Sequence, residues 1–157
     1  MSVIRDKPER AALERDGSFV MHFATFQGLK ASLFKVFGPT ATSIIYDAGI
    51  EPGRRSFLTL MKDCKTKKDV LELLIQYKAN ENWGDFKFHN MDWQGHSGKV
   101  SVARCFESRG VQSGDSQCYF LKGYLTGFLS ELFLTEVAMV EARCNAKGDA
   151  LCEFTFQ

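Results

Sequence analysis

Long apolar runs are missing from this sequence. No stretch reaches the length of a membrane span, and the polar N-terminus, residues 1–19, has no apolar signal core. A strong charge of either sign is missing too, because the formal net charge is only +1. The charge therefore gives no reason to expect direct contact with nucleic acid or with an anionic membrane. Together these absences predict a cytoplasmic protein with no membrane span.

An even set of cysteines is also missing. The chain has five, and an odd number argues against a framework of disulfide bonds. Cysteines stay reduced in the cytoplasm, which leaves metal binding as the better use for them.

The composition that remains is ordinary for one soluble globular domain. A chain of 157 residues is long enough to bury a real core, and 45% hydrophobic and 25% charged residues are usual proportions. The 14 phenylalanines suit a roomy apolar interior, although core packing alone also uses such residues. We divide the chain into a polar extension, residues 1–17, with a short helix starting at Pro8, and a domain, residues 18–157.

The first half of the domain mostly has the apolar spacing of helices. Residues 18–23 alternate as a short strand, and residues 28–37 then follow helical spacing up to a Gly-Pro stop. A second helix is predicted over 40–61, with a break or kink at 49–53. Thr66 has the position of an N-cap for an amphipathic helix that follows it.

The second half changes to a period of two. Residues 85–89 alternate as one strand, and residues 100–106 continue as a second strand after a turn. An apolar helix over 119–134 follows, and then a hairpin with strands at 136–143 and 150–156. Two hairpins imply a mostly antiparallel sheet with helices packed on it, which is an α+β fold.

Three cysteines and one carboxylate in the last third follow the pattern C-x22-E-x2-C-x7-C: Cys118, Glu141, Cys144 and Cys152. Zinc takes thiolate and carboxylate ligands in a tetrahedral shell, so we interpret these four residues as a Zn²⁺ site. Four protein ligands leave no open position, and the predicted zinc is therefore structural. Cys64 and Cys105 lie outside the pattern, and we interpret them as small buried hydrophobic residues.

The short spacing sets a condition on the strand that carries two of the ligands. Strand alternation puts Glu141 and Cys144 on opposite faces, so the strand has to bend near Arg143 if both bind one ion. The alternative is that Cys144 and Cys152 are only neighbours in a hairpin and that Glu141 is a surface carboxylate.

Two stretches of the last third resemble the 4-vinyl reductase domain family. They are Gly123-Tyr-Leu-Thr-Gly-Phe128 and the run from Val140 to Phe154 with its Glu-x-x-Cys, Gly and Cys-x-Phe positions. The family occurs in archaeal hydrocarbon-binding proteins and in the sensor part of bacterial phenol- and xylene-responsive regulators. The resemblance extends back through Trp83-Gly84 and, more weakly, through residues 33–53.

The resemblance implies a fold related to subunits of a vesicle-tethering complex. It also implies a zinc ion on the four residues named above, a buried pocket for small aromatic or hydrocarbon ligands beside the zinc, and a homodimer. The phenol sensors hold the phenol hydroxyl with a His and a Trp upstream of the first Cys. No spacing equates His89, Trp93 or His96 with that pair, so phenol specificity is not carried over. The regulators continue into further modules, so we expect either a stand-alone protein or a domain of a longer one.

The candidates for ligand contact are mostly aromatic: Trp83, His89, Trp93, Phe120, Tyr124 and Phe128. The last three form a stripe on one helix, which is usually core but here can also form a pocket wall. His89 and Trp93 have strand positions of equal parity and can face one polar group, although a solvent-facing pair is an equal alternative. Gly123 and Gly127 stand one turn apart, which favours close packing of a neighbouring element over space for a ligand.

Three functions are consistent with the sequence. The leading interpretation is a zinc-containing module that binds or senses a small hydrophobic molecule. The second is an enzyme resembling a tetrapyrrole vinyl reductase, but the sequence has no Gly-rich dinucleotide loop and no recognisable nucleophile–base pair. The third is a protein-interaction module, which rests on fold analogy alone.

Overall fold

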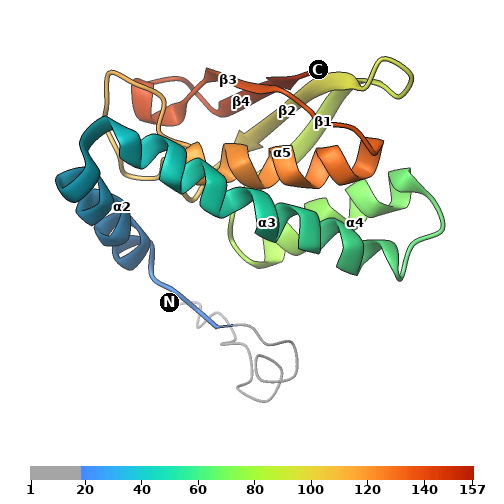
Figure 1. Cartoon of the computed structure of the whole chain (residues 1–157), viewed down its shortest axis with the longest axis horizontal. Helices are drawn as coiled ribbons and strands as arrows, with labels where there is room; N and C mark the ends of the chain where they lie inside the picture. The colour runs from blue at the N-terminus through green and yellow to red at the C-terminus, as the bar shows by residue number, and fades with distance from the viewer. Residues whose placement is uncertain (1–18) are drawn as a thin grey trace, which may run out of the picture.

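The computed structural model describes residues 19–157, which form helices packed on a four-stranded antiparallel sheet (Figure 1). The α+β prediction is therefore confirmed. The polar extension and the short helix predicted at Pro8 lie outside the described residues.

The first described helix, α2, spans Phe23–Phe37 and is followed by the 3-10 helix η1, Gly38–Thr40. The prediction of a strand over 18–23 is wrong where the structure describes it, because residues 19–22 have no regular structure and Phe23 is already helical. The carbonyl oxygen of His22 accepts the backbone N–H groups of Thr25 and Phe26, so helical turns begin where the alternation predicted a strand.

The helix α3 runs without a break from Ala41 to Met61, so the predicted break at 49–53 is wrong. Pro52 lies inside this helix and removes one helical N–H bond. Gly49 and Gly53 do not interrupt the helix, because both are buried against the backbone of α5. Packing of α3 on its neighbour therefore outweighs the low helix propensity of these residues.

The helix α4, Lys67–Asn80, begins as its N-cap predicted. Thr66 accepts the backbone N–H of Asp69, and the Asp69 carboxylate accepts the backbone N–H of Thr66, which is a full capping box. Val70, Leu71 and Leu74 bury the apolar face of this helix in the core.

The sheet has the strand order β1-β2-β4-β3. Its strands are β1 (Asp85–Asp92), β2 (Ser97–Ala103), β3 (Met139–Arg143) and β4 (Cys152–Phe156), with the 3-10 helix η2 (Asn145–Lys147) between the last two. All neighbours pair antiparallel, so the two predicted hairpins share one sheet through β2 and β4. The second strand ends earlier than predicted, because Arg104 has a positive φ of 55° and turns the chain away.

The helix α5, Tyr119–Phe133, lies between the sheet and α3 (Figure 1). It is buried along nearly its whole length, as its apolar composition predicts. Gly123 and Gly127 lie against the backbone of Tyr46 and Ile50 in α3, which confirms the packing interpretation of these glycines. No helix among residues 19–157 is long and apolar enough to cross a membrane.

Candidate metal centre and aromatic cluster

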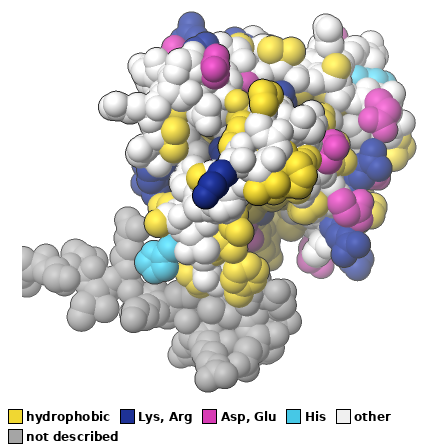
Figure 2. Space-filling view, turned by 60° about the vertical axis from the view of Figure 1, so that its left-hand side comes forward, with side chains coloured by type: hydrophobic (Ala, Val, Ile, Leu, Met, Phe, Trp, Pro, Cys, Tyr) yellow, Lys and Arg dark blue, Asp and Glu magenta, His cyan; other side chains and the backbone are white. Residues whose placement is uncertain are grey.

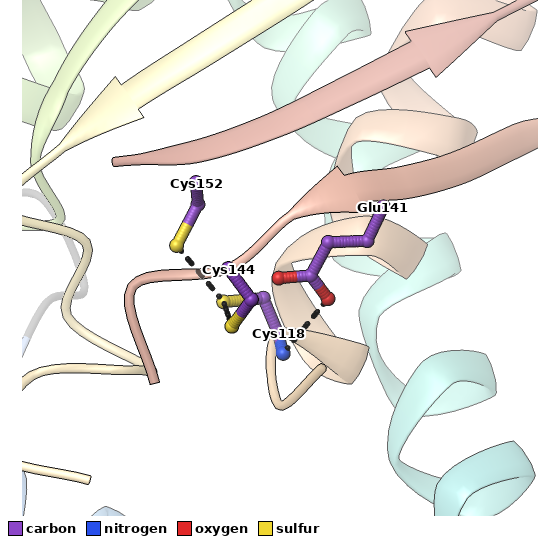
Figure 3. Close-up of side chains that lie close together, drawn as sticks. All are labelled: Cys118, Glu141, Cys144 and Cys152. Atoms are coloured by element: carbon purple, nitrogen blue, oxygen red, sulfur yellow. Dashed lines mark hydrogen bonds between the residues drawn. The ribbon is translucent and has the colours of Figure 1, made fainter. Parts of the chain in front are cut away.

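Three elements bring the four predicted metal ligands together (Figure 3). Cys118 is the N-cap of α5, Glu141 lies on β3, and Cys144 and Cys152 flank the η2 turn. One possible ligand atom from each of the four lies within 4.8 Å of every other. The alternative that the cysteines are neighbours only in the hairpin is wrong, because Cys118 joins them from a separate element.

The sulfur spacing fits a tetrahedral metal shell. The Cys118 Sγ lies 3.9 Å from the Cys144 Sγ and 3.5 Å from the Cys152 Sγ. Two thiolates on one zinc at Zn–S distances of about 2.3 Å are about 3.8 Å apart in a tetrahedron. The Cys118 sulfur therefore has the separation from the other two that such an ion requires.

The strand bends where the spacing requires it. The β3–β4 register shifts between Glu141 and Arg143, so one extra residue bulges out of the ladder. This bulge reverses the alternation after Glu141, and the side chains of Glu141 and Cys144 turn to one point (Figure 3). The turn that follows is closed by Gly148, whose φ is 99°.

The Glu141 carboxyl group is the clearest sign that the cluster fits a cation. Its Oε2 accepts the backbone N–H of Cys118 at 3.2 Å, whereas its Oε1 is buried without a hydrogen-bond partner. Burial, with a smaller contribution from the Cys144 thiol, raises the pKa of Glu141 to about 8. A divalent cation would supply the missing partner and would favour the ionised carboxylate.

Crowding has a similar effect on the central cysteine. Contact with the sulfur atoms of Cys105, Cys144 and Cys152 raises the pKa of the Cys118 thiol. A bound metal reverses this shift because a coordinating thiol is deprotonated. The donor set of three sulfur atoms and one carboxylate suits zinc.

Hydrogen bonds to sulfur surround the cluster. The backbone N–H of Gln117 donates to the Cys144 Sγ, and that of Asn145 donates to the Cys152 Sγ, both at 3.4 Å. The Ser108 hydroxyl also lies 3.2 Å from the Cys152 Sγ. Such donors stabilise thiolates and orient metal ligands.

Cys105 is the residue of this region whose place the sequence did not predict. It is buried, as interpreted, but its Sγ lies 3.6 Å from the Cys118 Sγ. It falls outside the recognised ligand pattern, and only its cysteine identity signalled a relation to the cluster. Cys64 is not fully buried, which corrects the second part of that interpretation.

A buried ion pair connects α2 to the start of α5. The fully buried Glu107 carboxylate accepts the backbone N–H groups of Phe120 and Leu121 and the Lys30 ammonium, at 3.0, 2.8 and 2.9 Å. Lys30 also donates to the carbonyl oxygen of Gln117 at 2.6 Å. This network holds α2 beside the residue that precedes Cys118, and no sequence signal indicated it.

The predicted pocket residues of α5 belong to one aromatic cluster. The Trp83 ring centroid lies 4.9 Å from that of Tyr124 and 5.9 Å from that of Phe120. Tyr124 in turn stacks on Phe128 with centroids 6.4 Å apart. Four of the six predicted contact residues are therefore neighbours.

Side chains of the protein itself occupy the space around this cluster. The Phe26 ring of α2 lies 5.2 Å from Phe106 and 5.7 Å from Phe120, centroid to centroid. The Lys78 Nζ lies 3.9 Å from the Trp83 centroid and 4.7 Å from the Tyr124 centroid. Two open surface hollows of about 510 and 440 Å³ lie elsewhere, and none of the six predicted contact residues lines them.

His89 and Trp93 lie apart from the aromatic cluster. His89 is exposed on β1 and its Nε2 pairs with the Ser101 hydroxyl at 2.8 Å. Trp93 lies in the turn after β1, is 41% exposed, and packs on Phe133 with centroids 5.9 Å apart. The β1–β2 register shifts between His89 and Asp92, so equal parity does not give these two residues a common face.

Comparison with known proteins supports the resemblance seen in the sequence. Residues 99–157 match the model of the 4-vinyl reductase domain. A comparison with curated proteins found no match.

Solved structures share the fold over most of the chain. The phenol-responsive sensory domain of the transcription activator PoxR, solved with phenol, has a TM-score of 0.76 at 19% identity and covers 88% of this chain and 75% of its own. A vinyl-4-reductase family protein from Methanocaldococcus jannaschii has a TM-score of 0.63 at 21% identity, with coverage of 100% and 98%.

The relation to a vesicle-tethering fold is also found. Trafficking protein particle complex subunit 3 from Naegleria fowleri, covalently bound to palmitic acid, has a TM-score of 0.65 at 16% identity. It covers 86% of this chain and 91% of its own. The resemblance seen in the sequence is thus confirmed: the C-terminal residues 99–157 of this chain belong to the 4-vinyl reductase domain family.

Proposed function

We propose that residues 18–157 form a zinc-stabilised, cytoplasmic module that binds a small aromatic or hydrocarbon molecule. The observation that carries the proposal is the position of the aromatic cluster. It begins with Phe120, two residues after the candidate metal ligand Cys118, and includes Trp83 and Tyr124. The similarity in fold to a sensory domain solved with phenol supports this class of ligand.

The metal in this proposal has a structural role. Cys118, Glu141, Cys144 and Cys152 would hold it, and the ion would balance their negative charge. These residues tie the start of α5 to the β3–β4 hairpin and so orient the aromatic stripe of α5. Elemental analysis of the purified protein should find one zinc per chain.

The ring of Phe26 indicates where a ligand would bind. It is only partly buried, and it covers Phe106 and Phe120 from α2 as an aromatic guest would. A ligand of one ring would take its place when α2 moves outward. Trp83, Phe120 and Tyr124 would then supply the apolar wall.

Ligand binding can be tested with a Phe26→Ala variant. The substitution removes one ring from the cluster, and apolar cavities of that size bind benzene-like molecules. We expect toluene, phenol and xylene to bind this variant at least tenfold more tightly than the unaltered protein, measured by calorimetry and native mass spectrometry. The matched control is Phe37→Ala, because Phe37 is at the other end of α2 and is 51% exposed.

Failure of the whole panel to bind either the unaltered protein or Phe26→Ala would contradict the ligand-binding proposal. Equal gains in Phe26→Ala and Phe37→Ala would contradict the location at Phe26.

We also propose a homodimer that forms through the α2 side of the molecule. Several large apolar side chains there are exposed: Phe19, Val20, Leu29, Val36 and Phe37. Figure 2, which turns this side forward, shows hydrophobic side chains in exposed patches. Sedimentation analysis should give a dimer that Val36→Glu converts to a monomer, and a monomeric unaltered protein would contradict this part.

A further inference from the structure

Cys105 adds a fourth sulfur atom to the metal cluster. The residue follows β2, where the positive φ of Arg104 turns the chain inward, and it is 2% exposed. Its Sγ lies 3.6 Å from the Cys118 Sγ, between the 3.5 and 3.9 Å that separate Cys118 from the other two ligand sulfurs. Cys118 therefore has three sulfur neighbours at the spacing expected for thiolates on one ion, about 3.8 Å.

Glu141 is the donor of the cluster that can leave most easily. It is only partly buried, whereas the four cysteines are buried. One hydrogen bond, from the Cys118 backbone N–H, holds its carboxylate, and its Oε1 has no partner. The cluster thus offers five donors to an ion that needs four, and the carboxylate is the one held least.

We propose that Cys105 is an alternative metal ligand that replaces Glu141 when a soft, thiophilic ion binds. The inference rests on the proposed metal centre and adds to it a second ligand set, the thiolates of Cys105, Cys118, Cys144 and Cys152. Zinc accepts a carboxylate beside three thiolates, but softer ions prefer sulfur throughout. This region would therefore hold soft divalent ions such as Cd²⁺ more tightly than its four-residue pattern implies.

X-ray absorption spectroscopy of the full chain loaded with Cd²⁺ or with Zn²⁺ tests the proposal. We expect four sulfur neighbours around cadmium, and three sulfurs with one lighter atom around zinc. In Cys105→Ser the cadmium shell should lose one sulfur while the zinc shell stays unchanged. Competition titrations should show at least a tenfold loss of the preference for cadmium over zinc.

Cys64→Ser is the matched control, because Cys64 is the one remaining cysteine and lies just after α3, outside the cluster. It should change neither shell. Cys105→Ala gives a second variant that buries no hydroxyl, and Glu141→Gln should keep the cadmium shell of four sulfurs while weakening zinc.

Three sulfurs and one lighter atom around cadmium in the unaltered protein would overturn the proposal, with or without stable variants. An unchanged cadmium preference in both Cys105 variants would overturn it as well, while leaving the zinc centre intact. Absence of binding by either ion would instead refute the metal centre itself, and this inference with it.

Discussion

Gly53 of α3 and Tyr124 of α5 touch through their backbones. A β-carbon at position 53 would overlap the carbonyl oxygen of Tyr124, and one at Gly127 would overlap the carbonyl oxygen of Ile50. Each helix thus presents glycines to the backbone of the other. This approach places the aromatic stripe of α5 at a fixed height above α3.

The glycine contact predicts that small additions destabilise the protein. Gly53→Ala should lower the free energy of unfolding by about 1 to 3 kcal/mol or more, because the helices have to separate. Denaturant unfolding measures this change. Gly28→Ala is the control, since Gly28 is exposed in α2 with open space around it, and alanine there should stabilise by about 0.5 to 1 kcal/mol. Equal effects at both positions would contradict the packing interpretation.

Loss of a metal ligand should weaken the whole domain. Cys144→Ser is expected to abolish stoichiometric zinc and to cost about 3 to 5 kcal/mol of stability, because metal binding and folding are linked. Thermal unfolding with and without a chelator checks this, and the chelator should have little further effect on the variant. Cys64→Ser should behave like the unaltered protein. Full zinc content and unchanged stability in Cys144→Ser would refute the prediction.

The buried pair of Lys30 and Glu107 should be worth more than a surface ion pair. Lys30→Met leaves a buried carboxylate without its cation, and we expect a loss of about 3 to 5 kcal/mol. Adding Glu107→Gln to Lys30→Met should cost less than the sum of the two single changes, measured in a double-mutant cycle. Lys35→Met, on the exposed part of α2, is the control and should change stability little. Additive effects would show that the pair is not coupled.

Lys78 should make stability depend on alkaline pH. Burial lowers the pKa of its ammonium below the ordinary 10.5, and the attraction of Glu81 opposes that shift. Between the lowered value and 10.5 the unfolded chain binds more protons than the folded one, so stability rises with pH in this window and is lost as pH falls. Unfolding curves from neutrality to about pH 10 should show a smaller slope in Lys78→Met than in the unaltered protein.

Lys62→Met provides the comparison for that experiment, because Lys62 is exposed at the end of α3. Its pH dependence should match that of the unaltered protein. The same slope in Lys78→Met and Lys62→Met would rule out Lys78 as the cause.

The sequence by itself determined the features that depend on residue type and on near neighbours. The donor set of the metal centre, the capping box at Thr66 and the buried helix α5 were all predicted, since each rests on the identity or short spacing of a few residues. Even the bend near Arg143 followed from strand alternation.

Only the tertiary structure decided what depends on distant parts of the chain. The glycines of α3 were expected to break a helix because their partner, the backbone of α5, is some 70 residues away; a similar separation hid the pair of Lys30 and Glu107. The place of Cys105 beside Cys118 likewise arises from a turn after β2 that local spacing does not encode. Periodicity reports the face on which a residue lies, whereas close contact depends on which other surface packs against that face.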